Sequence, residues 1–261
     1  MANKVEFSAK NVKSFLSWLK KFSSIDTGLL LEIDEPQSRF IAKTYNEERS
    51  VVKLSTIKFD EAGFTVKPSK DPKRIKVGIY NIVRLMKIID QFSENEFSFT
   101  VNWGELKDGE SVDYAGLSLV LKNKNLTINV DCTSLNIFKY ISDELFENVI
   151  SAMDTVEAKF ELLAEKINSI NQLCALDDDD YKHIEFKNAA NVYVIGKTFD
   201  FLINENSNEW DGKENTINIF KLQFANVDVG DYNVKMGEDK IVFTSSPFNS
   251  TTIVISRVEK D

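Results

Sequence analysis

The sequence has few of the residues that loosen or cross-link a chain. Its 261 residues include only ten Gly, four Pro and two Cys, and this scarcity of Gly and Pro argues against long disordered linkers. Cys132 and Cys174 lie far apart in apolar-patterned segments, which predicts free thiols in a reducing cytoplasm. No apolar run reaches about 18 residues, and the polar N-terminus lacks the apolar region of a signal peptide. We therefore expect no membrane association and a cytoplasmic location, in the host cell if the chain is viral.

Residue types that carry catalysis are also scarce. The one histidine, His183, lies on a predicted strand without the partners of a catalytic triad or a zinc site. No Gly-rich phosphate-binding loop occurs. The run Asp177–Asp180 lacks the spacing of a calcium loop, and its adjacent carboxylates cannot all face one ion. The run is predicted to be a solvated turn, and the chain is predicted not to be an enzyme and to hold no metal or cofactor.

The composition otherwise indicates a folded, acidic protein. Hydrophobic residues make up 43% of the chain and include nineteen Phe, enough for one large core or two small ones. The net charge is −9 and the sequence pI about 4.9. This charge argues against nucleic-acid binding by the whole surface but leaves room for a local basic stripe.

In the first half of the chain, two amphipathic helices alternate with strands. Apolar residues at helical spacing predict a helix over Ala9–Phe22, capped by Ser8, and a second over Tyr80–Gln91. Basic Lys67–Lys76 and polar Lys107–Gly109 are predicted to be loops. Apolar alternation predicts strands over six further segments: Leu29–Ile33, Arg39–Tyr45, Ser50–Phe59, Glu96–Trp103, Leu117–Leu121 and Leu126–Val130.

The second half repeats this order after a mixed segment, Ser134–Thr155, that is typical of a connector. Helices are predicted over Ala164–Cys174 and, more briefly, over Phe220–Ala225, and Asn204–Glu214 is a predicted polar loop. The predicted strands of this half are Lys159–Leu163, His183–Phe186, Asn191–Ile195, Phe199–Ile203, Asp231–Met236, Lys240–Ser245 and Thr251–Val258.

The two halves thus predict an α+β protein built twice from one module, with two helices packed on an antiparallel sheet in each copy. The expected organisation is an N-terminal domain of residues 1–140, a connector of residues 141–157 and a C-terminal domain of residues 158–261.

Basic residues gather on or beside the four predicted helices, whereas acidic residues concentrate in the loops and the connector. Such segregation favours a surface that faces phosphates. Lysines without interleaved aromatic residues suit sequence-independent contact with duplex DNA rather than base stacking. The alternative is that these are ordinary solvated lysines. The candidate DNA-facing residues are Lys10, Lys13, Lys20, Lys21, Arg84, Lys87, Lys166 and Lys221.

Several segments resemble DNA polymerase sliding clamps, most closely those of T-even bacteriophages. The strongest match is NTINIFKLQFANVDVGDY (Asn215–Tyr232), which is similar to the segment that leads into the last strands of the clamp. GLLLEI (Gly28–Ile33) and VGIYNIVRLMKII (Val77–Ile89) resemble a first-domain strand and helix. The end, ISRVEKD (Ile255–Asp261), is similar to the terminal strand of cellular clamps such as proliferating-cell nuclear antigen.

The resemblance implies the DNA-clamp fold and a head-to-tail homotrimer. Its helices would line a ring around double-stranded DNA and its outer face would bind short peptides of the DNA polymerase and the clamp loader. The chain departs from cellular clamps at YNEERSVVKL (Tyr45–Leu54) and lacks their C-terminal aromatic-Leu-Ala-Pro run. The client-peptide pocket is expected to include the following residues, unless these are simply core and turn residues: Leu145, Phe146, Val149, Ile150, Pro247, Ile253 and Val254.

Subunit contacts are expected between two edge strands, because pairing across chains removes exposed edges. The candidate interface residues on those strands are Leu117, Leu119, Leu121, Val192 and Val194. The alternative function is a non-catalytic phage structural or adaptor protein of β-rich repeat architecture.

Overall fold

The computed structural model describes residues 3–67, 71–108, 111–141, 156, 158–177, 180–205, 214–246 and 250–259. The chain divides into two compact units. Unit 1 comprises Met1–Thr44 and Leu54–Ser142, and unit 2 comprises Tyr45–Lys53 and Asp143–Asp261.

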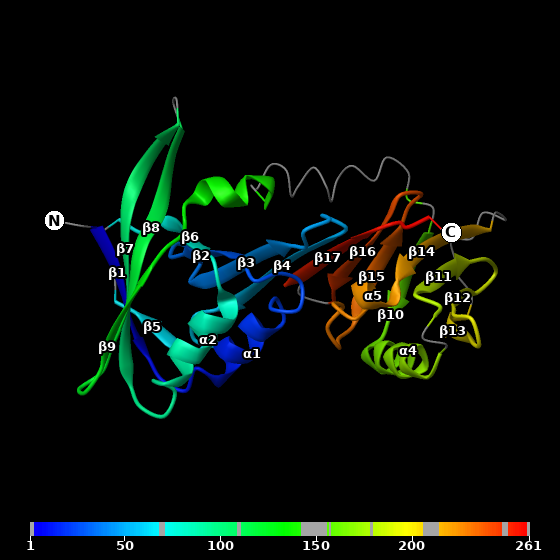
Figure 1. The fold of residues 1–261 in the computed structure, drawn as a ribbon, viewed down its shortest axis with the longest axis horizontal. Helices are drawn as coiled ribbons and strands as arrows, with labels where there is room; N and C mark the ends of the chain where they lie inside the picture. The colour runs from blue at the N-terminus through cyan, green and yellow to red at the C-terminus, as the bar shows by residue number, and fades with distance from the viewer. Residues whose placement is uncertain are drawn as a thin grey trace. The chain divides into compact units, whose positions relative to one another are not determined.

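Unit 1 combines a strongly curved set of strands with two helices, α1 and α2 (Figure 1). The sheet order is β4-β3-β2-β6-β8-β7-β1-β5, and β9 pairs with β8. Neighbours β2 and β3 are antiparallel, whereas β6 and β8 run parallel. The elements of this part of the chain are β1 (Asn3–Ala9), α1 (Lys13–Lys20), β2 (Leu29–Asp34), β3 (Arg39–Tyr45), β4 (Val51–Lys58), β5 (Phe64–Val66), β6 (Arg74–Ile79), α2 (Ile82–Asp90), β7 (Phe97–Asp108), β8 (Ser111–Lys122), β9 (Thr127–Asp131) and the 3-10 helix η1 (Leu135–Ile141).

Aromatic side chains fill the core of unit 1. Phe15 of α1 lies 4.9 Å from Phe40 of β3 and 5.0 Å from Phe64 of β5, measured between ring centroids. Phe7 of β1 meets Phe59 edge-to-face at 5.0 Å. Each such tilted aromatic pair stabilises the fold by about 1 kcal/mol in addition to the stabilisation from burying its apolar surface. The helices are therefore fixed to the sheet through their apolar faces, and their other faces are left exposed.

The start of α1 differs from the prediction. The sequence predicted a helix from Ala9 with Ser8 as its cap, but Ser8 lies in β1 and its hydroxyl donates to Glu96 Oε1 at 2.7 Å. The turn before the helix passes through Asn11 at φ +57°, a left-handed conformation that Asn tolerates better than most residues. The helix therefore begins later, at Lys13.

The hairpin of β7 and β8 is longer than predicted. Lys107–Gly109 was expected to be a loop, but β7 continues through Asp108, which pairs with Ser111 of β8. Trp103 and Tyr114 pack edge-to-face across the two strands at 5.2 Å. This aromatic pair supports strand pairing beyond the point at which the sequence pattern turns polar.

Unit 2 is built on the same plan from two sets of four hydrogen-bonded strands. Their strand orders are β10-β15-β16-β17 and β13-β12-β11-β14. The elements are β10 (Ala158–Leu162), α4 (Ala164–Leu176), β11 (His183–Asn188), β12 (Val192–Ile195), β13 (Asp200–Asn204), β14 (Asn215–Phe220), α5 (Lys221–Phe224), β15 (Tyr232–Met236), β16 (Lys240–Ser245) and β17 (Thr251–Ser256).

The core of unit 2 is also aromatic. Phe186 of β11 lies 5.8 Å from Phe224 of α5 and 6.1 Å from Phe243 of β16. His183 stacks on Phe220 at 4.7 Å, so the one histidine has a packing role on its strand. The α+β class and the order strand, helix, strands, helix, strands in both units are confirmed.

The segment Tyr45–Lys53 belongs with unit 2 because it is tied to its strands and loops. Ser256 N donates to Ser50 O at 2.8 Å. The fully buried Lys53 pairs with Asp228 at 2.8 Å and also donates to Asn226 O at 3.1 Å. A buried ammonium needs such partners, so Lys53 fixes the loop after α5.

Both cysteines are free thiols in the structure. Burial raises the pKa of Cys132 to about 12 and that of Cys174 to about 11, so neither forms a reactive thiolate at neutral pH. No helix in the described part of the chain is long and apolar enough to cross a membrane.

Candidate nucleic-acid interface

Helix α1 buries one face and exposes a basic one. Phe15 and Leu19 are fully buried, and Trp18 donates from Nε1 to Ser55 Oγ at 3.0 Å. Lys13 and Lys20 are exposed. They lie seven residues apart, about two helical turns, and so share one side of the helix.

Helix α2 packs beside α1 (Figure 1) and likewise buries one face and exposes a basic one. The side chain of Asn81 caps it by accepting a hydrogen bond from Arg84 N at 2.8 Å. Ile82 and Ile89 are fully buried, whereas Arg84 and Lys87 are exposed. The cap fixes the first turn, and with it the direction in which Arg84 leaves the helix.

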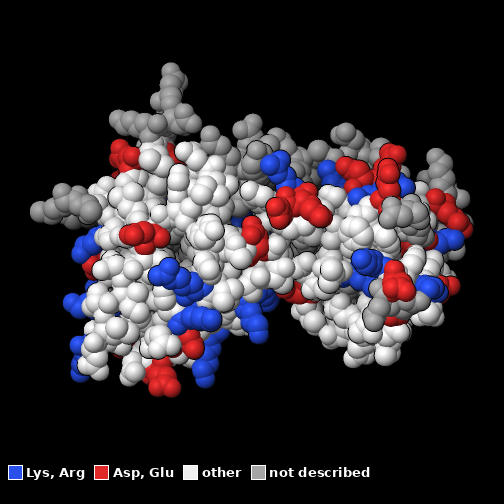
Figure 2. Space-filling model, in the orientation of Figure 1, with Lys and Arg blue, Asp and Glu red and all other residues white. Residues whose placement is uncertain are grey.

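The exposed cations on and directly beside these helices are grouped here as the basic helix face: Lys10, Lys13, Lys20, Lys21, Arg84 and Lys87. Figure 2 shows Lys and Arg side chains gathered over the region that α1 and α2 occupy in Figure 1. Lys13, Lys20, Arg84 and Lys87 form no ion pair with a described residue. Their charge is therefore available to an external anion.

The two predicted DNA-facing residues of unit 2 are placed differently. Lys166 of α4 is only partly exposed, and its ammonium lies over the ring of Phe201 at 5.2 Å from the centroid. Lys221 of α5 forms an ion pair with Asp177 at 2.9 Å, and its side chain is only 15% exposed. Lys221 is therefore a structural partner of a carboxylate rather than an open basic site.

Asp177 was expected in a solvated turn, and this was wrong. Its side chain is fully buried, and it accepts hydrogen bonds from Thr198 Oγ1 at 2.7 Å and Lys197 N at 3.1 Å. Burial by itself would raise the pKa of this carboxyl, but the Lys221 ammonium and the hydrogen bonds outweigh burial and lower it well below its usual range. Asp177 thus joins the end of α4, the turn between β12 and β13, and α5.

The strands expected at the subunit interface are not sheet edges. β8 has β7 on one side and β6 and β9 on the other, and β12 lies between β11 and β13. Most of the predicted interface side chains are buried, namely Leu119, Leu121, Val192 and Val194, whereas Leu117 is 54% exposed. The edges next to those strands are β9 in unit 1 and β13 in unit 2.

No protein-family model and no curated protein sequence matches this chain. Solved structures do match. The beta clamp of Helicobacter pylori superposes with a TM-score of 0.67 at 11% identity over 99% of this chain and 64% of that one. A putative DNA polymerase III beta subunit from Eubacterium rectale gives 0.66 at 14% identity over 100% and 67%. The PCNA of A. fulgidus, solved with the C-terminal region of FEN-1, gives 0.60 at 11% identity over 98% and 100%.

This chain has the fold of a sliding clamp. It spans about two thirds of the length of the bacterial clamps and the whole length of the archaeal PCNA chain. The H. pylori clamp has also been solved bound to a DNA ligase peptide, and this chain matches that structure with a TM-score of 0.63 at 12% identity over 100% of this chain and 67% of that one.

Most of the pocket predicted for client peptides on this clamp fold lies outside the described residues: Leu145, Phe146, Val149, Ile150 and Pro247. Ile253 and Val254 lie on β17 and are buried in the chain. For these two residues the placement agrees with the alternative, that they belong to the core.

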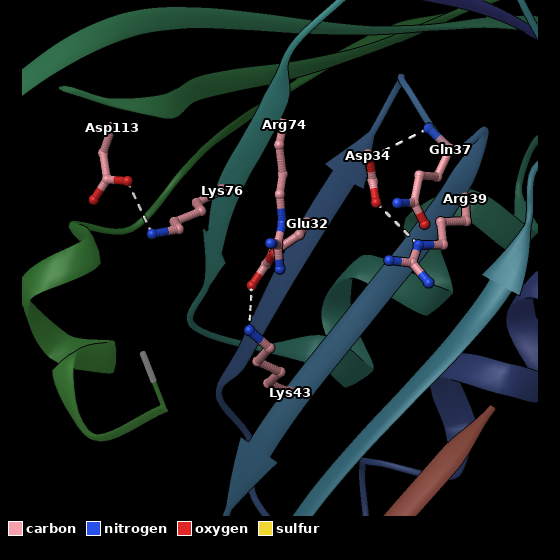
Figure 3. A network of polar contacts seen from close by, with 8 residues as sticks. All are labelled: Glu32, Asp34, Gln37, Arg39, Lys43, Arg74, Lys76 and Asp113. Carbon is pink, nitrogen blue, oxygen red and sulfur yellow. Dashed lines mark hydrogen bonds and ion pairs between the residues drawn. The ribbon is translucent and has the colours of Figure 1, made fainter. Parts of the chain in front are cut away.

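A buried ionic network in unit 1 was not predicted. Glu32 of β2 pairs with Lys43 of β3 at 2.7 Å, and its other oxygen accepts from Arg74 Nε of β6 at 2.6 Å (Figure 3). Glu32 and Lys43 are almost completely buried, whereas Arg74 is 40% exposed. In the sequence, Glu32 is the one carboxylate within the apolar run LLLEI. The apolar pattern does not indicate which distant side chain this carboxylate contacts.

Proposed function

We propose that this chain is a sliding clamp that encircles duplex DNA and holds the replicative polymerase and other clients on it. The observation that carries the proposal is the basic helix face of unit 1, on an acidic chain with the clamp fold. A basic surface on two neighbouring helices and the residues beside them favours a polyanionic partner.

The chemistry of this face suits sliding. Lysines dominate it, and an ammonium contacts phosphate as a point charge without fixed geometry. No aromatic side chain is among the exposed residues of α1 that could hold an unstacked base. Contacts would be weak and sequence-independent, and retention on DNA would come from closure of the ring.

The proposed ring is a homotrimer assembled head to tail. A heterologous contact that closes produces a ring, and unpaired strand edges supply the contact. The edges β9 and β13 are better candidates than the strands chosen from the sequence, because each has one unpaired side in the described sheets. Pairing β9 of one subunit with β13 of the next would cover both.

Clients would bind as short peptides. The matching H. pylori clamp is bound to a DNA ligase peptide and the matching A. fulgidus PCNA to the C-terminal region of FEN-1. We propose that a DNA polymerase and a clamp loader bind this chain in the same manner, through an apolar pocket that includes the connector.

Sedimentation equilibrium tests the assembly. Three chains of 29.8 kDa predict a particle of about 89 kDa, which electron micrographs should show as a ring. A strict monomer at every concentration would argue against the proposal. The clamp should also lengthen the products of its polymerase on a primed template, and this stimulation should fall when Arg84 and Lys87 are replaced by Ala.

A further inference from the structure

The helices of the two units present different surfaces to solvent, although they occupy equivalent places in the repeated module. We propose that, in the clamp function above, the helices of unit 1 carry the contact with DNA phosphates and those of unit 2 do not. This inference rests on the proposed function and assigns its phosphate contacts to the cationic helices of unit 1 alone.

The exposed stripe of α1 is cationic. Lys13, Ser17 and Lys20 follow one another at intervals of four and three residues, and all three are exposed. Residues Lys10–Lys21 contain four lysines and no Asp or Glu. Because no Asp or Glu lies on this helix, and because neither Lys13 nor Lys20 forms an ion pair with a described residue, the charge of both lysines attracts an approaching phosphate.

The exposed stripe of α4 carries no cation, and Glu165, which is exposed one turn before Asn168, adds a negative charge to it. Asn168, Gln172 and Leu176 follow one another at intervals of four residues and are all exposed, with Leu176 82% exposed. None of them attracts phosphate by charge. The cation Lys166 lies off this stripe, and its ammonium is held over the Phe201 ring. This cation–π contact within unit 2 makes the ammonium less available to an external phosphate.

The second helix of unit 2 is equally closed to phosphate. Lys221 is neutralised by Asp177, and the next residue, Leu222, is 83% exposed. An isolated exposed leucine is ordinary. Leu176 at the end of α4 and Leu222 on α5 are exposed where α1 and α2 carry cations, and neither of these two described helices has a fully exposed Lys or Arg.

The division predicts how DNA affinity responds to salt. The logarithm of the binding constant for duplex DNA falls with the logarithm of salt concentration by about 0.9 for each phosphate contact. Removal of a lysine that contacts phosphate lowers this slope, and removal of any other lysine leaves it unchanged.

Four variants test the division by titration of a labelled duplex at several salt concentrations. K13A/K20A removes the cations of the α1 stripe, and K166A removes the cation of α4. N168K/Q172K places two cations on the exposed stripe of α4, and K235A removes an exposed lysine from strand β15 as a matched control. All the replaced side chains except Lys166 are exposed, and sedimentation and circular dichroism verify folding and assembly.

We expect K13A/K20A to lower the slope by about 1 or more, N168K/Q172K to raise it, and K166A and K235A to leave it at the wild-type value. A loss of slope in K166A equal to that in K13A/K20A would overturn the division, as would an unchanged slope in K13A/K20A. In either case wild-type binding would still support the clamp function. If the wild type binds no duplex at any salt concentration, the proposed function fails and the inference fails with it.

Discussion

At the scale of single residues, two buried carboxylates organise the chain. Glu32 joins three strands of unit 1, and Asp177 joins two helices to a turn in unit 2. Sequence reasoning identified neither, because a charged residue in an apolar or acidic run gives no sign of which distant side chain it will meet. The burial of Phe15 and Phe22, by contrast, could be predicted from their helical spacing.

Replacement of Glu32 by Ala should destabilise the protein by about 3–5 kcal/mol, because it leaves the Lys43 ammonium buried without its partner. The double variant E32L/K43M removes both buried charges and leaves Arg74, whose side chain is 40% exposed, to solvent, so its stability should be within about 1 kcal/mol of the wild type. Urea unfolding measures both variants. Equal destabilisation by the single and double changes would contradict the role of the pair.

Asp177→Asn should lower stability at pH 7 by about 2 kcal/mol, because Lys221 loses its charged partner. The pKa of Asp177 is lowered in the folded state, so its ionisation stabilises the fold wherever the unfolded carboxyl, with a pKa of about 3.9, is also ionised. This stabilisation is complete above about pH 5 and is lost as the pH falls toward the folded-state pKa.

Urea unfolding of the wild type and of Asp177→Asn from pH 7 downward tests this account. The difference in stability between the two should shrink steadily below about pH 4. The exposed Glu161, replaced by Gln, is the matched control. A difference that stays constant with pH would mean that the ionisation of Asp177 does not stabilise the fold.

At the scale of elements, periodicity predicted the helices and most strands. The spacing of Phe15 and Leu19 located α1, and apolar alternation located β3 with the bounds that the structure has. Strand β14 was missed because Asn215, Thr216 and Asn218 break its apolar pattern. Edge positions could not be predicted, since an edge is defined by the absence of a neighbour that comes from elsewhere in the chain.

Leu202 lies on the edge strand β13 and pairs with Tyr193 on the interior strand β12. Replacement of Leu202 by Lys should weaken trimer assembly at least about tenfold, because a charge on an edge strand opposes pairing with another chain. Tyr193→Lys places the same charge on the same sheet face but leaves the edge strand unaltered, so assembly should persist. Analytical ultracentrifugation measures trimer assembly of the two variants. Equal weakening of assembly by both would argue against β13 as the interface.

At the scale of the whole molecule, the proposed function depends on the shape of a ring rather than on a reactive group. The clamp fold has two helix-bearing units, and the fully exposed cations of the described helices lie on the first of them. The sequence predicted the class of fold and the basic face of unit 1. It did not predict that unit 2 would neutralise Lys221, because that depends on a buried ion pair.

The proposal that this protein encircles duplex DNA is tested most directly by comparing its retention on circular and on linear DNA. The protein is placed on nicked circular duplex by a clamp loader and separated from free chains by gel filtration in high salt, where electrostatic binding is weak. We predict that it stays with the circle and is lost once a single cut gives the duplex free ends. Equal retention on circular and linear molecules would contradict encirclement.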